Sequence, residues 1–251
     1  MRRTLLALVV LPLALAACGG GSKHTTSNAT PLNAVENAAL KTVQAGSEHL
    51  SVRATANAGG QQIVVTGNGV FDTKRHLGSL HVDLNAGAIT AALDEVLDGT
   101  ILYVKSPLLA AAVPKGKTWL KVDLKKAGKA GGVDLSQLTA QDPAQALNYL
   151  RSLKSAAKVG TEQIGGVSTT HYTAQVDVSK LSPAAAAQVG AGTYDVWVGD
   201  DGYVHRVRLV TTAGAKVSAT SDLSDFGAAV KVTVPSAAQS YATNKIPGLG
   251  G

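Results

Sequence analysis

The sequence predicts an α+β protein built on a long, strongly bent antiparallel sheet with a few helices against one face. Several segments alternate apolar and polar residues with a period of two, which is typical of strands that bury one face. Short turns containing glycine separate several of these segments, as in hairpins. Other segments repeat apolar residues every three or four positions, which indicates helices. A sheet with one apolar face must cover that face, so we expect the helices to pack there.

The first half of the chain is expected to begin with a helix over 31–43. Pro31 suits a first helical turn and Gly46 suits the residue that ends a helix. From His49 the period changes to two, with a hairpin at Gly59-Gly60. Strands are expected at 51–55, 61–71, 77–84, 101–105 and 119–124, followed by a helix over 142–156 that begins at Asp142-Pro143.

The second half repeats this alternation. Strands are expected at 172–178, 194–198, 203–211, 216–223 and 230–234, with a tight turn at 200–202 and a short alanine-rich helix over 183–190. A polar, glycine-rich stretch over 236–251 is expected to be a loose tail. The length suits one large domain, for which we predict the limits 32–235.

The first 17 residues have the pattern of a signal peptide. Arg2 and Arg3 precede an apolar run over 5–15, which is shorter than the roughly 20 residues that span a membrane. The run ends at Leu15-Ala16-Ala17-Cys18, which resembles the bacterial lipobox. This resemblance implies diacylglycerol on the Cys18 thiol and cleavage just before it. Residues 18–31 then form a lipidated, flexible tether at the outer, extracytoplasmic face of the cell membrane.

Charge and composition exclude some classes of function. The net charge is +6, and near +4 once Arg2 and Arg3 are removed, which favours an anionic membrane surface. No cluster of Lys and Arg is interleaved with aromatic residues, so a nucleic-acid partner is not expected. The only cysteine is Cys18, so no intramolecular disulfide forms. Aromatic residues make up only 4% of the chain, so the core depends on aliphatic side chains, and such a core can leave room for a ligand.

No motif in the sequence indicates catalysis, a metal or a cofactor. The six histidines are dispersed, without the spacing of a metal site. The segment Gly116-Lys117-Thr118 ends like a phosphate-binding loop, but position 111 is alanine where that motif needs its first glycine. No nucleophile elbow and no spaced pair of carboxylates occurs. We therefore expect no enzyme activity.

Several segments resemble the LppX/LprAFG-type lipoproteins of actinobacteria and their wider relatives of the LolA-like fold. The resemblance rests on 103–107, 116–124, 160–172, and 196–198 with Asp201-Gly202 and Arg206-Val207, and it covers roughly 33–234. It implies a half-barrel sheet, closed by helices around an apolar pocket. It also implies binding of acylated lipid and its carriage across the cell envelope, with an envelope transport partner.

The apolar positions of two expected strands are the candidates for the pocket wall. These are Leu80, Val82, Leu84, Leu120 and Val122, and their alternative role is ordinary core packing. A second hypothesis for the whole protein has no lipid cavity. In that case the chain is a structural or signalling surface lipoprotein that binds a protein partner of the envelope.

Overall fold

In the computed structural model, the described residues are 30–58, 60–127, 129–130, 133–134, 153–177, 179, 193–211 and 217–243. Along the chain the elements are α1 (Pro31–Gln44), β1 (Ser47–Ala58), β2 (Gln61–Asp72), β3 (Leu77–Ala86), β4 (Ile89–Asp98), β5 (Ile101–Lys105), the 3₁₀ helix η1 (Pro107–Ala112), β6 (Trp119–Asp123), α2 (Leu124–Ala127), β7 (Lys129–Ala130), β8 (Val133–Asp134), β9 (Leu153–Ile164), β10 (Val167–Val176), β11 (Thr193–Gly199), β12 (Val204–Thr211), β13 (Val217–Ser224) and β14 (Ser240–Thr243).

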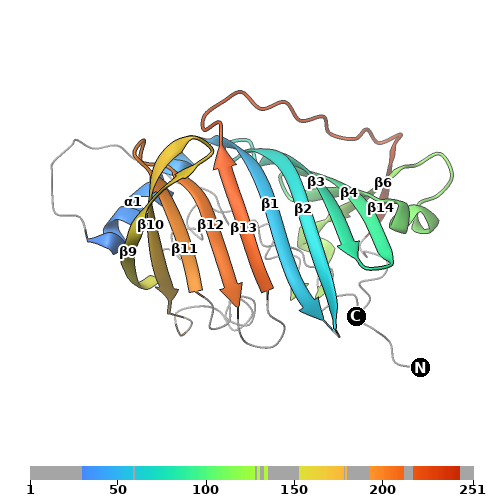
Figure 1. Cartoon of the computed structure of the whole chain (residues 1–251). Coiled ribbons are helices and arrows are strands. Elements are labelled where there is room, and N and C mark those ends of the chain that lie inside the picture. Colours follow the sequence, from blue (N-terminus) through green and yellow to red (C-terminus); the bar gives the residue numbers. More distant parts are fainter. Residues whose placement is uncertain are drawn as a thin grey trace.

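One large, open and curved sheet dominates the molecule (Figure 1). Its twelve strands run in the order β14-β6-β5-β4-β3-β2-β1-β13-β12-β11-β10-β9. All neighbours are antiparallel except β14 and β6, which are parallel. The early strands β1 to β6 and the late strands β9 to β13 meet where β1 pairs with β13, so one continuous sheet joins both parts of the sequence.

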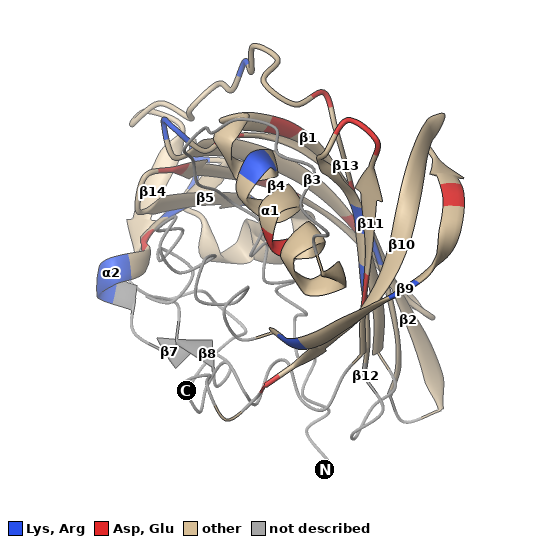
Figure 2. Ribbon diagram, turned by 90° about the vertical axis from the view of Figure 1, so that its left-hand side faces the viewer, with Lys and Arg blue, Asp and Glu red and all other residues tan. Residues whose placement is uncertain are grey.

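The helix α1 forms for the reasons that its sequence indicates. The Thr30 hydroxyl accepts a hydrogen bond from the Asn33 amide at 3.3 Å, and Pro31 occupies the first turn. One face of the helix is buried, through Val35, Ala38, Ala39, Thr42 and Val43. This face packs on the concave side of the sheet, around which the strands curve (Figure 2).

Two polar side chains of α1 attach it to the β11–β12 hairpin. The Thr42 hydroxyl donates to the Ala38 carbonyl and accepts from the Val204 amide, both at 2.8 Å. The Lys41 ammonium donates to the Asp201 carbonyl and lies 4.5 Å from the centre of the Tyr203 ring. These contacts place the helix over one end of the sheet, near β9 to β12.

The strand register separates a concave and a convex face. One row on the concave face reads Leu223, Leu50, Gly69, Leu80, Glu95, Val104 and Leu120 from β13 to β6. A row on the convex face reads His171, Trp197, Arg206, Asp222, Ser51, Asn68, His81, Asp94 and Lys105 from β10 to β5. The first row is apolar except for Glu95, whereas polar side chains dominate the second.

Most of the expected strands are present, and the helix over 31–43 is confirmed. The hairpin at Gly59-Gly60 is confirmed by the pairing of Ala58 with Gln61. The turn at 200–202 is also confirmed, since the Gly202 amide donates to the Gly199 carbonyl at 2.7 Å and Gly202 has a positive φ of 79°. The cover by a few helices is confirmed only in part, because α1 is the one described helix longer than six residues.

The prediction of a helix over 142–156 is wrong for its last four residues. Leu153 to Ala156 belong to β9, which pairs with β10, while 142–152 lie outside the described residues, as does the helix expected over 183–190. The run Leu153-Lys154-Ser155-Ala156 has no strong intrinsic preference for a strand. Its hydrogen bonds with β10 therefore decide the conformation, and local propensity does not.

Two further strands of the large sheet were not expected from the sequence, nor was the short pair β7 and β8, and one expected strand is absent. Strand β4 lies between two expected strands, and β14 lies within the stretch predicted to be a loose tail. The strand expected at 230–234 is wrong, because that segment forms no strand pairing. It runs from β13 towards β14 along the upper edge of the molecule in Figure 1. Val230, Val232 and Val234 are half-buried there, which explains their alternation without a neighbouring strand.

Candidate functional site: the apolar concave face

The candidate wall residues all lie on the concave face. Leu80, Val82 and Leu84 alternate with the exposed His81 and Asp83 along β3. Leu120 and Val122 share this face from β6, since Leu120 pairs with Val104 in the row that contains Leu80. The structure therefore brings the five residues to one side of the sheet, on two strands separated by β4 and β5. Whether they contact a ligand stays a prediction.

These five side chains differ in how much surface they leave open. Leu120 and Val122 are 1% and 0% exposed, so in this conformation neighbouring atoms cover them. Leu80 belongs to the cluster beneath α1 that includes Val35 and Leu50, and Leu84 belongs to a second cluster with Ala54 and Val65. Val82 packs against both clusters and stays partly exposed. It is thus the wall candidate with surface available to a ligand.

Glycines allow side chains to lie close to the backbone of this face. A Cβ atom at Gly69 would come within 2.3 Å of the Ser79 carbonyl oxygen and 2.9 Å of Leu80 Cδ1. A Cβ atom at Gly78 would come within 2.3 Å of the Phe71 ring. Any larger residue at these positions would displace the side chains that form the apolar surface.

A carboxyl group, Glu95, interrupts the apolar row. Glu95 pairs with Leu80 on one side and with Val104 on the other, and both are buried. Leu93 and Leu97 flank it on the same face of β4. No hydrogen bond or ion pair joins Glu95 to another of the described residues. Burial raises the pKa of the Glu95 carboxyl to about 7.

A second carboxyl group, Glu48, lies on the same face at the start of β1. It is only 4% exposed and pairs with Phe71 of β2. Burial, and secondarily the negative charge of Asp72, raises the pKa of Glu48 to about 8. Sequence reasoning singled out neither glutamate. The signal for Glu95 was a single acidic residue at an apolar position of an alternating segment, which is visible only once β4 is recognised as a strand.

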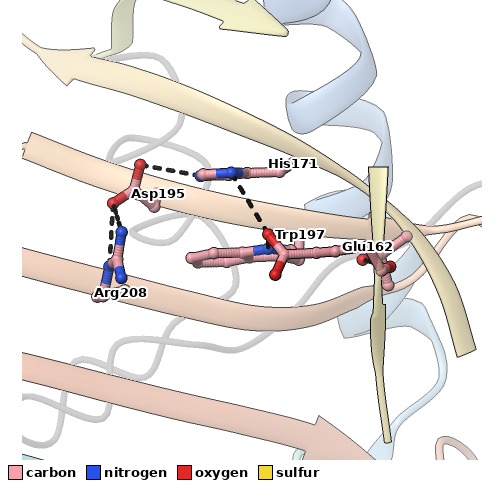
Figure 3. A network of polar contacts seen from close by, with 6 residues as sticks. Glu162, His171, Asp195, Trp197 and Arg208 are labelled. Atoms are coloured by element: carbon pink, nitrogen blue, oxygen red, sulfur yellow. Dashed lines mark hydrogen bonds and ion pairs between the residues drawn. The ribbon is translucent and has the colours of Figure 1, made fainter. Parts of the chain in front are cut away.

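The convex face carries a closed network of polar contacts around Trp197 (Figure 3). The indole ring of Trp197 stacks on His171 with ring centres 4.2 Å apart, and its Nε1 donates to the Glu162 carboxylate. His171 Nε2 lies 3.0 Å from Asp195 Oδ1, and Arg208 donates to Asp195 Oδ2 at 2.8 and 3.1 Å. Trp197 is only 3% exposed.

This network fits a structural role. The carboxylate of Asp195 receives both His171 and Arg208, and Glu162 receives Trp197 and lies 3.5 Å from His171. A general base needs a free acceptor within reach of a substrate, whereas both oxygens of Asp195 and Oε1 of Glu162 are already engaged. The contacts join four neighbouring strands, β9 to β12, and we interpret them as a clamp across the sheet.

A smaller charged cluster lies on the convex face of β3 to β5. His81 Nδ1 is 2.6 Å from Asp94 Oδ1, and Lys105 Nζ is 3.2 Å from Asp94 Oδ2. The hydrogen bond with Asp94 raises the pKa of His81 and lowers the pKa of Asp94. All three side chains are at least two-fifths exposed, so the cluster contributes little to stability.

The described part of the chain contains neither a candidate metal site nor a membrane-spanning helix. None of its histidines, cysteines and carboxylates gather in a group of three that could hold a metal ion. None of its helices is long and apolar enough to cross a membrane. Cys18 lies outside the described residues.

Together, these features define the class of protein: an open, curved sheet with one apolar face, against which an N-terminal helix packs. The chain belongs to the LppX_LprAFG lipoprotein family, whose profile matches residues 30–232. The resemblance predicted from the sequence is therefore confirmed.

Two sequence relatives and one solved structure illustrate this membership. The chain is 25% identical over 255 residues to an uncharacterised 31.2 kDa protein of Streptomyces griseus, covering 90% of this chain and 83% of that protein. It is 30% identical over 100 residues to lipoprotein LprA of Mycobacterium tuberculosis, covering 38% of this chain and 41% of LprA. The crystal structure of LprF from Mycobacterium bovis superimposes with a TM-score of 0.52 at 14% identity, covering 82% of this chain and 96% of LprF. At that identity the match shows the shared fold alone.

Proposed function

We propose that this protein is a membrane-anchored lipoprotein that binds an acylated lipid against the concave face of its sheet. The observation that carries the proposal is the row of residues on that face from Leu223 to Leu120 across seven strands, which is apolar except for Glu95. A hydrocarbon chain gains about 0.8 kcal/mol for each CH₂ group that leaves water, so such a surface suits acyl chains. Val82 offers part of its surface to them.

The anchor belongs to the same proposal. The signal peptide over 1–17 and the lipobox at Cys18 would place two acyl chains on the first residue of the mature protein. The tether over 18–31 would then allow the folded domain, over 32–235, to approach the outer face of the membrane. In this proposal the protein carries the bound lipid across the cell envelope and delivers it to a transport partner.

The test is to purify the full chain in detergent and to extract its non-covalently bound lipid for mass spectrometry. We expect acyl lipid in amounts comparable to the protein. Val82→Phe adds bulk to the partly exposed part of the wall, and overpacking of about 1–3 kcal/mol should lower the bound lipid about tenfold. Asn68→Phe is the matched control, because Asn68 is exposed on the convex face of β2.

The proposal fails if the wild-type protein contains no lipid and takes none up from a supplied mixture. It also fails if Asn68→Phe lowers the bound lipid as much as Val82→Phe. In the first case the alternative, a surface lipoprotein that binds a protein partner and has no lipid cavity, becomes the better account.

A further inference from the structure

The row from Leu223 to Leu120 on the concave face contains one polar group, Glu95, whose presence the packing of the sheet does not explain. Glu95 is surrounded on its own face by Leu80, Val104, Leu93 and Leu97. A leucine at this position would continue the apolar row. An ionisable group that is kept among apolar neighbours without a partner costs stability, and groups perturbed in this way cluster at functional sites.

Among the described residues, the surroundings of Glu95 offer no cation. On the concave face, β3 contributes Gly78, Leu80 and Val82, and β5 contributes Leu102 and Val104. The 3₁₀ helix η1, which also contacts β4, consists of proline, leucine and alanine. On β3 to β5, the charged groups His81, Asp83, Asp94 and Lys105 form one cluster of contacts on the convex face, and Asp98 lies exposed at the end of β4. From α1, Lys41 is bonded to the Asp201 carbonyl.

Glu95 is nevertheless only half-buried, so part of this residue remains open to solvent. The neutral and the ionised forms of the Glu95 side chain differ in the ligand groups that can bind beside them. A hydroxyl group can accept a hydrogen bond from the acid and can donate one to the carboxylate, so it suits both states. A phosphate can be accommodated only by the acid, because two negative charges in a site of low dielectric repel each other strongly.

We propose that Glu95 is the specificity-determining residue of the concave face, which binds the hydroxyl group of an uncharged acyl lipid and excludes an anionic phosphate head group. This proposal rests on the function proposed above and names the class of lipid that the same site takes. Glu95 then holds the polar end of the ligand, while the flanking leucines and valines hold its acyl chains.

The expected behaviour depends on pH in a defined direction. Because burial raises the pKa of Glu95 to about 7, the carboxyl is mostly ionised above that pH and mostly neutral below it. Discrimination against phosphate should therefore be strong at about pH 8.5 and weak at about pH 5.5. Binding of the hydroxyl lipid should change little over the same range, because both states of the carboxyl form the hydrogen bond.

The experiment offers two lipids with the same acyl chains to the full, anchored protein in detergent. Dioleoylglycerol carries a hydroxyl group, and dioleoylphosphatidate carries a phosphate at the same position. The ratio of the two complexes is read by native mass spectrometry from an equimolar mixture. For the wild-type protein we expect a preference of at least about tenfold for dioleoylglycerol at about pH 8.5. That preference should mostly disappear at about pH 5.5.

Two variants separate charge from hydrogen bonding. Glu95→Gln keeps a hydrogen-bonding group without the charge, so it should bind both lipids similarly at both pH values. Glu95→Leu removes the hydrogen bond as well and should bind dioleoylglycerol more weakly than Glu95→Gln. Asp83→Asn is the control, because it removes one negative charge from the exposed convex side of β3. It should keep the wild-type preference.

The outcomes distinguish this proposal from the one on which it rests. If the wild-type protein binds neither lipid, the proposed function fails and the role of Glu95 fails with it. If the wild-type protein, Glu95→Gln and Glu95→Leu bind both lipids in the same ratio at both pH values, lipid binding stands and the role of Glu95 is refuted. A preference that is lost in Asp83→Asn would likewise refute it, because overall charge would then explain the selectivity.

Discussion

Replacing Glu48 with glutamine should make the folded protein markedly less sensitive to alkaline pH. The pKa of Glu48 is raised from 4.5 to about 8 by burial and by Asp72. In the unfolded chain this carboxyl loses its proton near its ordinary value. Between these two values the folded state holds a proton that the unfolded state has released, so each rise in pH favours unfolding.

The size of the effect follows from the interval between the two pKa values. Each pKa unit corresponds to about 1.4 kcal/mol, so the full interval from 4.5 to about 8 represents about 5 kcal/mol. This stability is present below about pH 4.5 and is lost as the pH rises through about 8. Glu48→Gln is neutral at every pH and should not show the loss. The variant should therefore be up to about 5 kcal/mol more stable than wild type at about pH 9, and similar to it at about pH 4.5.

The assay is urea unfolding, followed by the fluorescence of the buried Trp197, at several pH values. Glu95 contributes in the same direction between 4.5 and about 7, so the slope that remains in Glu48→Gln should be smaller in the double variant with Glu95→Gln. Asp72→Asn removes the negative charge that is the second cause of the raised Glu48 pKa. It should therefore lower that pKa and reduce the loss of stability that the wild-type protein shows as the pH rises. A difference between wild type and Glu48→Gln that stays constant with pH would refute the reasoning.

Three further predictions concern the anchor and the packing of the sheet. Cys18→Ala should release the protein from the membrane fraction, and a variant that stays bound after fractionation would contradict the lipid anchor. Thr42→Val removes the acceptor of the Val204 amide at a buried site and should lower the free energy of unfolding by about 1–3 kcal/mol in urea titrations. Trp197→Phe keeps the stacking but removes the hydrogen bond to Glu162, so it should cost about 1–3 kcal/mol, and less than Trp197→Ala in the same thermal unfolding experiment. Equal losses in the two variants would show that the hydrogen bond, and not the ring, carries the stability.

The site was only partly predictable from the sequence. Alternation along 77–84 correctly placed Leu80, Val82 and Leu84 on one face, because side chains of a strand point alternately to opposite sides. That β6 adds Leu120 and Val122 to the same surface depends on two intervening strands, one of which had not been recognised. The role proposed for Glu95 required the identity of its neighbours on β3 and β5, which no local pattern contains.

By itself, the sequence determined the features that depend on neighbouring residues. These are the helix that Thr30 and Pro31 begin, the glycine turns, the alternating strands, and the motifs that identified the family. Only the tertiary structure decided the features that depend on distant pairing. Strand β9 forms where part of a helix was expected, and β14 pairs with β6 more than a hundred residues earlier in the chain. The reason is that a strand is stabilised by hydrogen bonds to its neighbours, so where those neighbours lie far away in the chain, local propensity and periodicity do not determine the outcome.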